Sequence, residues 1–309
     1  MAFNWQVFRT RTLTAILFAA IMLAGLLINH WTFFLLFSII HFGCWLEYQR
    51  LVGLIDKDYS QLHPFHKYGV MIAGWCIMLY FTDDTYNLLG LRLHELGWWT
   101  GLLFVFLLPI MELLFSKQIQ LKNIGYSALG LVYISLSCGL MIDLGSFIRQ
   151  VFYQSDLFVA FHSFSYFTAL IPLAIIISLW VNDTMAYLVG SLIGKTPLTK
   201  ISPKKTWEGT VGGIILSIVL TGLFFSYIPT EIVGPGYHFR VAPETWYIIA
   251  GISAVAGTMG DILESKLKRI AGVKDSGIIL PGHGGFLDRF DSMLFATPFV
   301  WIYLQISMY

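Results

Sequence analysis

Charged residues are scarce in this sequence. Only 12% of its 309 residues are Asp, Glu, Lys or Arg, whereas 57% are hydrophobic; soluble domains usually carry roughly 25% charged residues. A soluble fold of this length could not bury so much apolar surface and still present a charged exterior. The net charge of +1 gives no reason to expect nucleic-acid binding. The composition excludes an ordinary soluble protein and indicates a chain that crosses a membrane repeatedly.

Cysteine is also rare, with three residues in the whole chain. Cys44, Cys76 and Cys138 lie in separate apolar runs and share no spacing typical of a metal or redox site. We therefore expect them to be small buried side chains of membrane helices. His63 and His66 are spaced at i and i+3, which could suit a metal, but a solvated pair in a polar loop is the expected role.

Long hydrophobic runs make up most of what is present. Nine segments approach the ~20 residues that a helix needs to cross hydrocarbon, so we predict an all-α, polytopic integral membrane protein with about nine transmembrane helices. The predicted spans are roughly 13–29, 31–46, 68–82, 93–115, 124–147, 165–190, 209–228, 246–263 and 290–308. About five belong to an N-terminal half, residues 1–150, and about four to a C-terminal half, residues 151–309, in which the chemistry gathers.

Cationic residues are distributed unevenly over the connections between these spans. Sixteen of the 19 Lys and Arg residues fall at the N-terminus or in even-numbered connections, and only Arg92, Arg149 and Arg240 fall on the opposite side. Lys and Arg in short loops remain cytoplasmic. We therefore expect the N-terminus to be cytoplasmic and the C-terminus to lie outside.

Polar groups near hydrocarbon are costly and usually functional, and two cytoplasmic connections hold most of them. The first comprises loop 191–208 and the preceding span end, and its candidate substrate-binding residues are Asn182, Asp183, Ser202, Lys204 and Lys205. The lysines could neutralise phosphate, although an ordinary cationic flank is the alternative. Gly190 and Gly194 share the helix face of Asp183, where they would let another backbone or a ligand approach closely.

The second connection, loop 264–289 with the flanking span ends, mixes acids, bases and glycines. Asp261, Ser265, Lys268 and Arg269 share one helix face, and they are followed by Lys274, Asp275, His283, Gly284, Gly285, Asp288, Arg289 and Asp291. Gly-rich backbone beside cations suits phosphate oxygens, and carboxylates on separate helices suit Mg²⁺. Asp288 and Asp291 could instead simply stabilise a helix N-terminus. Acids from three segments, gathered on one membrane face among cations, indicate a metal–polyphosphate site.

The residues of this second connection resemble a known signature. Residues 265–291 read SKLKRIAGVKDSGIILPGHGGFLDRFD, which resembles without departure the signature of phosphatidate cytidylyltransferases, also called CDP-diacylglycerol synthases. Residues 202–209, SPKKTWEG, resemble the same family. The resemblance implies Mg²⁺ at Asp261 and Asp288, and we add Asp291 as a third candidate ligand; a monovalent cation such as K⁺ is an optional second ion.

The same resemblance implies roles for the remaining residues. Asp261, Asp288, Lys268 and Arg269 would be catalytic, and Ser265 and the lysines would hold phosphate groups. The other substrate-binding candidates are Lys274, Asp275, His283, Gly284, Gly285 and Arg289. His283 and the adjacent glycines belong to the motif without one assigned role.

The family resemblance also implies an activity. The enzyme would transfer CMP from CTP to phosphatidic acid, giving CDP-diacylglycerol and pyrophosphate for phospholipid biosynthesis. Metal ions and lysines would screen the repulsion between the two anionic substrates. The expected partners are CTP, phosphatidic acid and membrane lipids, with no nucleic acid, and a homodimer stays open as the assembly state. The expected location is the cell inner membrane, with the active site facing the cytoplasm.

Two other functions are compatible with parts of the pattern. A CTP-dependent polyprenol or phytol kinase would use the same nucleotide but transfer the γ-phosphoryl group, leaving CDP; the match over 265–291 argues against it. An ion or solute transporter would use Glu112, Asp143 and Asp183 as ligands within the membrane. However, the polar residues gather in cytoplasmic connections and not at the midplane, and no inverted repeat is evident.

The charge distribution makes the topology testable. Single cysteines placed at Lys200 and at Tyr309 are expected to react with a membrane-impermeant thiol reagent from opposite sides of the membrane, because nine spans separate the two ends of the chain. Labelling of intact and of opened vesicles distinguishes the sides. Reaction of both positions from the same side would contradict the nine-span arrangement.

Overall fold

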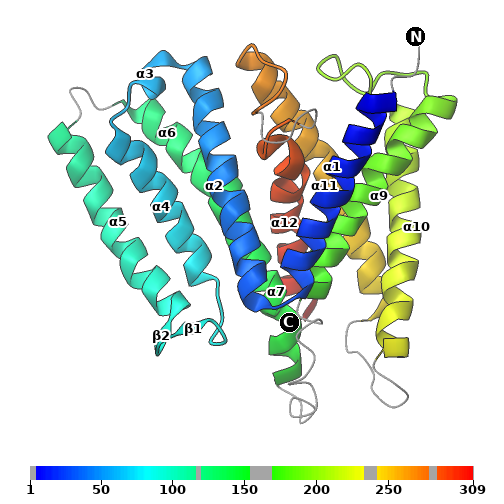
Figure 1. The fold of residues 1–309 in the computed structure, drawn as a ribbon, viewed down its shortest axis with the longest axis horizontal. Coiled ribbons are helices and arrows are strands. Elements are labelled where there is room, and N and C mark those ends of the chain that lie inside the picture. Colours follow the sequence, from blue (N-terminus) through cyan, green and yellow to red (C-terminus); the bar gives the residue numbers. More distant parts are fainter. Residues whose placement is uncertain (1–4, 116–119, 154–168, 233–241, 278–283, 309) are drawn as a thin grey trace.

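The computed structural model describes residues 5–115, 120–153, 169–232, 242–277 and 284–308. The regular structure is helical apart from a short antiparallel hairpin of β1 (Asn87–Leu88) and β2 (Leu91–Arg92). The helices are α1 (Trp5–Leu27), α2 (His30–Ile55), α3 (Lys57–Ser60), α4 (Pro64–Tyr80), α5 (Leu93–Phe115), α6 (Leu121–Gly130), η1 (Leu131–Leu136), α7 (Ser137–Tyr153), α9 (Leu170–Ile193), α10 (Trp207–Ile232), α11 (Pro243–Ile270) and α12 (Leu287–Met308). Figure 1 shows the arrangement, and the prediction of an all-α chain is confirmed.

Apolar segments of membrane-spanning length account for these helices. Every predicted span overlaps a helix, and the segment 124–147 falls on the continuous rod α6–η1–α7. In the part of the chain that the structure describes, six helices are long and apolar enough to cross a membrane: α2, α5, the rod over Leu121–Ser146, α9, α10 and α11. The chain is therefore a multi-pass membrane protein. The apolar helix Thr12–Leu27 is shorter than this limit.

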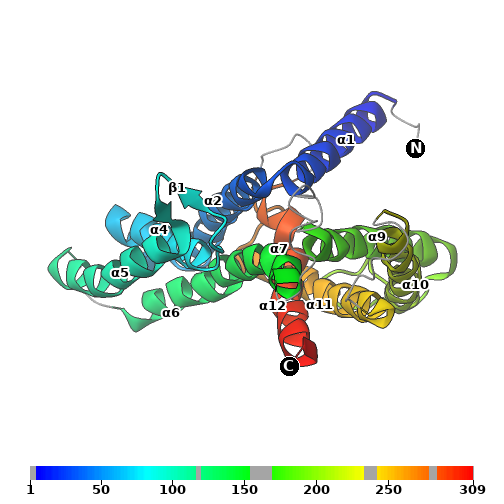
Figure 2. The same cartoon turned by 90° about the horizontal axis from the view of Figure 1, so that it is seen from below.

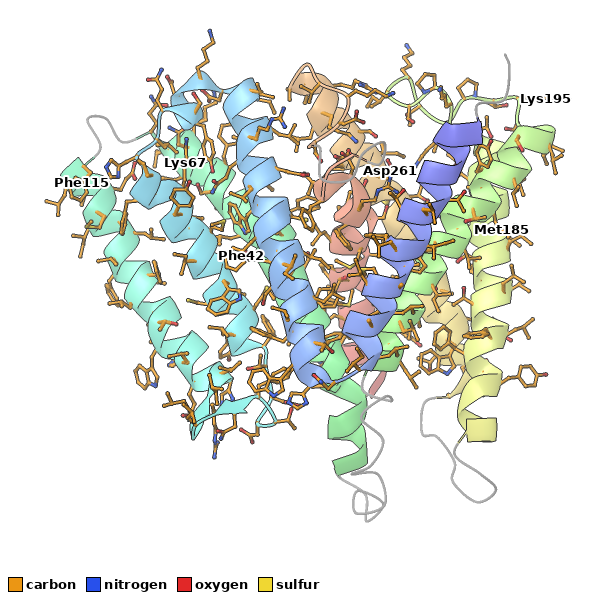
Figure 3. All side chains as sticks on the ribbon, in the orientation of Figure 1. Phe42, Lys67, Phe115, Met185, Lys195 and Asp261 are labelled. Carbon is orange, nitrogen blue, oxygen red and sulfur yellow. The ribbon has the colours of Figure 1, made fainter. Side chains whose placement is uncertain are left out.

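The helices run alternately between two ends of the molecule (Figure 1). The N-terminus, α3 and the loop 194–206 lie at one end, whereas the β1–β2 hairpin and the C-terminus lie at the other. Lys67 and Lys195 both lie toward the first end in Figure 3. We call this first end the polar end. It collects both of the connections in which the sequence places its candidate functional residues.

The bundle has two groups of helices with α7 and α12 between them (Figure 2). On one side lie α2, α4, α5 and α6, and on the other lie α9, α10 and α11. The first helix, α1, packs across the predicted boundary at residue 150: the Phe18 ring lies 6.3 Å from the Trp180 ring in α9 and 5.9 Å from the Phe290 ring in α12. Helix α1 thus contributes to the C-terminal group, although it is the first in sequence.

Two sequence expectations for rare residues have different outcomes. The three cysteines are free and buried, as predicted. His66 is also buried, since Nδ1 lies 2.8 Å from Glu112 Oε2 and Nε2 lies 2.8 Å from Ser127 Oγ. The expectation that His66 is solvated is therefore wrong, because the first turn of α4 packs against α5 and α6. His63 is exposed and stacks on the Phe115 ring.

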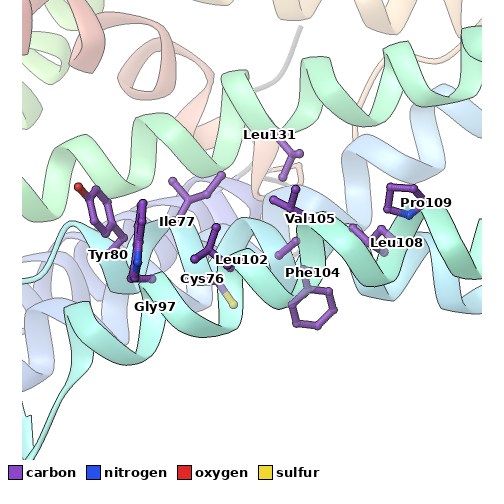
Figure 4. A pocket seen from close by; sticks show the side chains of 13 residues that line it. Cys76, Ile77, Tyr80, Gly97, Leu102, Phe104, Val105, Leu108, Pro109 and Leu131 are labelled. Atoms are coloured by element: carbon purple, nitrogen blue, oxygen red, sulfur yellow. The ribbon is translucent and has the colours of Figure 1, made fainter.

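An apolar cavity of about 440 Å³ lies between α4 and α5 (Figure 4). Its lining is almost entirely hydrophobic and includes Ile77, Leu102 and Val105. Neither polar connection contributes to it, so it is separate from the candidate functional residues.

Small residues hold α9 and α10 close together, next to the polar end. A Cβ atom added at Gly209 would lie 2.6 Å from the Ala186 carbonyl oxygen and 2.9 Å from the Gly190 Cα, both in α9. One added at Gly213 would lie 2.8 Å from the Asn182 carbonyl oxygen. This small-xxx-small pattern lets two membrane helices approach at backbone distance. The sequence suggested that glycines of α9 let either another backbone or a ligand approach closely. At Gly190 the close approach of another backbone is confirmed.

This packing predicts a large effect of bulk at Gly213. Leucine there would collide with the α9 backbone, so Gly213→Leu should destabilise the folded protein by about 1–3 kcal/mol or more. The measurement is the midpoint of thermal unfolding in detergent. Gly125→Leu is the matched control, because a Cβ at Gly125 has nothing within 4 Å. Equal midpoints for both variants would contradict the close contact.

Candidate active site

The loop between α9 and α10 is closed by its own hydrogen bonds. The Leu198 N–H donates to the Lys205 carbonyl oxygen at 2.7 Å. The Glu208 carboxylate accepts from the backbone N–H groups of Lys195 and Thr196 at 3.2 Å. A carboxylate in the first turn of α10 also complements the helix dipole. The loop is thereby folded back over the end of α9, and its lysines lie beside the polar residues of that helix.

A polar cavity of about 420 Å³ opens under this loop. All five candidates of the first connection line it, together with Asp261 from α11. The Asn182 side chain is buried and donates to Thr258 Oγ1 at 3.3 Å, whereas its Oδ1 has no hydrogen-bond partner among the described residues. Five further polar lining residues are not among the predicted site residues: Tyr187, Ser191, Thr206, Thr210 and Thr258. We call this space the larger cavity.

A second cavity of about 160 Å³ lies between α1, α9, α11 and α12, and we call it the smaller cavity. Asp183 and Asp261 line both cavities, so the two spaces meet at these acids. The remaining charged lining residues are Lys268, Asp288, Arg289 and Asp291. The structure therefore brings together acids from α9, α11 and α12, as the sequence predicted for the membrane face.

Lys205 and Asp261 form an ion pair where the cavities meet. Ser265, one turn further along α11, donates from Oγ to the other Asp261 oxygen at 3.3 Å. Burial lowers the pKa of the Lys205 ammonium, and the neighbouring charges of Asp183 and Asp291 oppose this shift. The pair links the loop after α9 to the middle of α11, and it sets a cation beside two acids.

Asp288 accepts several hydrogen bonds at the start of α12. Its Oδ2 accepts from the backbone N–H groups of Gly285 at 2.8 Å and Ser276 at 2.9 Å, and its Oδ1 lies 2.5 Å from Lys268 Nζ. Gly284 has a backbone φ of +79°, a conformation that residues other than glycine rarely adopt. Asp288 thus accepts hydrogen bonds beside the helix start and also lines the smaller cavity.

Glu264 is a buried acid that sequence reasoning did not single out. Its side chain is fully buried, and Oε2 lies 2.5 Å from Lys268 Nζ. Lys268 therefore bridges Glu264 and Asp288, and so connects α11 to α12. The spacing of i and i+4 between Glu264 and Lys268 is a signal that could have indicated this pair.

Glu47 is the second functional candidate that the sequence did not reveal. It lies inside α2 and is 7% exposed, although the predicted span ends one residue before it. Its carboxylate accepts from the N–H groups of Phe286 and Leu287 at 2.9 Å, and from Ser276 Oγ at 2.6 Å. No local spacing indicates a contact between residues 229 to 240 positions apart.

Some predicted site residues lie away from both cavities. The Arg269 guanidinium donates to the Val273 carbonyl oxygen at 3.2 Å, beyond the end of α11. Lys274 and Asp275 are exposed and line neither cavity. His283 lies outside the described residues.

Asp291, in contrast, is buried and lines the smaller cavity, where its Oδ1 accepts from the Ser292 N–H at 2.6 Å.

The donor atoms around the smaller cavity allow a test of the predicted metal. Its carboxylate oxygens are of the kind that Mg²⁺ prefers. Within the described ranges, however, no three His, Cys, Asp or Glu side chains are close enough to form a metal-ligand group. Mg²⁺ is usually bound through one or two carboxylates together with waters and substrate phosphates. The residues present fit an ion of that kind, with few protein ligands, and do not form a three-carboxylate cage.

Comparison with known proteins shows which family the chain resembles. Phosphatidate cytidylyltransferases of Staphylococcus saprophyticus, Haemophilus influenzae and Thermotoga maritima are 45%, 42% and 40% identical to the chain over 126, 129 and 141 residues. These alignments cover 40%, 41% and 45% of the chain, and 45%, 43% and 51% of the relatives, so the matched part spans about half of each relative's length. A family model described as the cytidylyltransferase family matches residues 9–307, nearly the whole chain. The chain belongs to the cytidylyltransferase family.

Proposed function

We propose that this protein transfers CMP from CTP to phosphatidic acid, producing CDP-diacylglycerol and pyrophosphate. The observation that carries the proposal is the pair of joined cavities at the polar end, where acids and lysines from α9, α11, α12 and the loop 194–206 meet. A nucleotide triphosphate and a phospholipid headgroup are both polyanions, and this mixture of cations and acids suits them. The names of the matched relatives support the same activity.

The larger cavity is the proposed binding site for CTP. Its volume of about 420 Å³ lies within the ~300–1,000 Å³ usual for small-molecule sites. Lys204 and Lys205 line it and would contact phosphate oxygens, while Asn182 offers a buried amide oxygen that is not hydrogen-bonded among the described residues. The smaller cavity adjoins it and lies against apolar α1 residues such as Phe18. It is the proposed site for the lipid phosphate.

The reaction joins a phosphate oxygen of phosphatidic acid to the α-phosphorus of CTP. The new P–O bond forms as the bond between the α-phosphorus and the oxygen bridging to the β-phosphorus breaks, and that oxygen leaves with pyrophosphate. The attacking oxygen is already anionic, so no strong general base is required. Lys205 and Lys268 would stabilise charge that develops on the phosphoryl oxygens and on the leaving group. Ion pairing with Asp261 and Asp288 keeps both ammonium groups in place.

Mg²⁺ is the proposed cofactor, with K⁺ as an optional second ion. Asp261 and Asp288 are the carboxylates that would hold it, and Asp291 lies in the same cavity as a third candidate. When bound, Mg²⁺ supplies charge neutralisation and Lewis-acid polarisation of phosphate oxygens. The proximity of Lys205 and Lys268 would place additional positive charge around the same oxygens.

The proposed topology has nine spans, a cytoplasmic N-terminus and an active site that faces the cytoplasm. The alternating helices of Figure 1 and the concentration of Lys and Arg at one end support this orientation. The proposed location is the cell inner membrane. CTP would enter from the cytoplasm, while the acyl chains of the lipid stay in the bilayer. A homodimer is the proposed assembly state.

The transporter hypothesis receives little support from the same residues. Glu112 lies 2.8 Å from His66, and Asp143 accepts from Trp301 Nε1 at 2.7 Å. Asp183 lines the joined cavities and belongs with the other acids of the polar end. The three acids therefore serve separate contacts and do not mark one path for an ion.

The products of the reaction test the proposed function. Purified protein incubated with α-labelled CTP, phosphatidic acid and Mg²⁺ is expected to move label into the organic phase and release pyrophosphate in equal amount. A CTP-dependent kinase would instead leave the α-label in soluble CDP and phosphorylate an alcohol. Absence of lipid-bound label with a folded, monodisperse protein would reject the proposal.

Removal of one acid tests the role of the cavity carboxylates. Asp261→Asn keeps size and polarity but removes the charge, so turnover should fall about 100-fold or more at every Mg²⁺ concentration. Asp261 lies in the middle of α11, so helix capping cannot account for such a loss. Because groups acting as a unit are non-additive, Asp261→Asn with Asp288→Asn should be little worse than either change alone.

The control for this experiment is another carboxylate outside the cavities. Asp84 is exposed and pairs with Arg92 beside the β1–β2 hairpin. Asp84→Asn should retain full turnover. Activity of Asp261→Asn within tenfold of the original protein would contradict the assigned role.

A further inference from the structure

We infer that Glu47 is a positioning residue: the α2 carboxylate fixes the start of α12 and thereby the orientation of Asp288 toward the cavity. This inference rests on the proposed function for its effect on turnover, but its structural part is independent of it. Glu47 lines neither cavity, so it would act through other residues and not by touching a substrate.

The carboxylate of Glu47 is hydrogen-bonded through both oxygens. Oε1 accepts from the Phe286 N–H, and Oε2 accepts from the Leu287 N–H, each at 2.9 Å. Leu287 begins α12 and Phe286 directly precedes it, so neither N–H group has an acceptor within the helix. A carboxylate there satisfies the free donors and complements the positive end of the helix dipole. Glu47 thus does for α12 what a capping residue usually does, but from a different helix.

Ser276 connects this capping interaction to Asp288. Its Oγ lies 2.6 Å from Glu47 Oε2 and 2.9 Å from Asp288 Oδ2, and its single proton can be donated to only one of them at a time. The Ser276 N–H donates to Asp288 Oδ2 at 2.9 Å in addition. Asp288 also follows Leu287 directly in the chain. A shift of the Glu47 carboxylate would therefore reach Asp288 by two routes, the backbone of α12 and Ser276.

Two glycines lie directly against this carboxylate. A Cβ atom at Gly277 would lie 2.1 Å from Glu47 Oε1, and one at Gly285 would lie 2.2 Å from Oε2. Real Cβ atoms do not approach so closely, so a side chain at either position would displace the carboxylate. Two glycines of the sequence signature thus have a physical role in accommodating a residue from the other half of the chain.

The test uses substitutions that alter the interaction by different means. Glu47→Gln keeps the shape but turns one acceptor oxygen into an NH₂ group that faces N–H or O–H donors. Gly277→Ala leaves Glu47 unchanged but pushes its carboxylate aside. Both should lower kcat by about 10- to 100-fold, because misplacing a reacting group by about 1 Å is enough for such a loss. KM for CTP should stay within about threefold, since Glu47 does not line the larger cavity.

The structural readout is hydrogen–deuterium exchange of the segment 284–292. Loss of the Glu47 acceptors should expose the N–H groups of Phe286 and Leu287 and raise exchange there in both variants. Ser276→Ala is a smaller change, so it should also raise exchange and lower kcat, but by less. It replaces the other variants in the experiment if they do not fold. The double variant Glu47→Gln with Gly277→Ala should be no worse than the single ones, since both remove one interaction.

The matched control is a hydrogen bond at the other end of α12. Trp301 donates from Nε1 to Asp143 Oδ2 in α7 at 2.7 Å, 13 residues after Asp288, or about 20 Å along a helix. Trp301→Phe removes a bond between α12 and another helix without changing the helix start. It should lower the unfolding temperature but leave kcat and the exchange of 284–292 unchanged.

The possible outcomes separate this inference from the proposed function. Raised exchange with lowered kcat supports it. Unchanged exchange in Glu47→Gln, or raised exchange with unchanged kcat, overturns it, as does an equal loss of kcat in Trp301→Phe. If the original protein forms no CDP-diacylglycerol, the proposed function fails, whereas the exchange experiment still decides whether Glu47 fixes the start of α12.

Discussion

A carboxylate at the end of a membrane helix is stable only when other groups compensate its charge or donate hydrogen bonds to its oxygens. The polar end of this protein meets that constraint with three ion pairs made by two lysines and with backbone N–H groups. Lys205 compensates Asp261, and Lys268 is shared by Glu264 and Asp288. The positions of the loop after α9 and of the first turn of α12 both follow from these contacts. The site is thus assembled by the same interactions that make its acids tolerable.

Helix packing brings the residues of these contacts together. Small residues bring α9 and α10 to backbone distance, which sets Asp183 and the following loop against α11. On the other side, α2 provides Glu47 and α1 provides Phe18, so both helix groups contribute to the polar end. The contacts at the polar end are therefore not confined to the C-terminal half. The N-terminal helices α1 and α2 contact the residues of the polar end directly.

The sequence predicted the fold to the extent that hydrophobic length determines it. Runs of about 20 apolar residues must form helices in a membrane, so each predicted span overlaps one. Helix α2 continues to Ile55, beyond the predicted end at residue 46, because polar residues such as Glu47 face a polar partner inside the bundle. Period and hydrophobicity cannot reveal that, since the partner lies more than 200 residues away in the chain.

For the site, the sequence predicted the residue types but not their pairing. Asp183, Asp261, Asp288 and Asp291 do line one cavity, because the ends of α9, α11 and α12 meet. Helix-face arguments grouped Arg269 with Lys268, yet α11 ends at Ile270 and the guanidinium turns to Val273. The i, i+4 spacing of Glu264 and Lys268 could have predicted their ion pair from the sequence. No such spacing predicts the contacts of Glu47.

The central place of α12 has a consequence for biosynthesis. It supplies Asp288 and Asp291, and its first N–H groups receive the carboxylate of α2, one of the earliest helices to be made. Because chains are synthesised from the N-terminus, Glu47 is inserted long before its partners exist. A nascent chain whose α12 has not yet left the ribosome and entered the membrane lacks one wall of the smaller cavity. Catalytic competence would then arise in a single late step of membrane insertion, which limits unregulated turnover by unfinished or truncated chains.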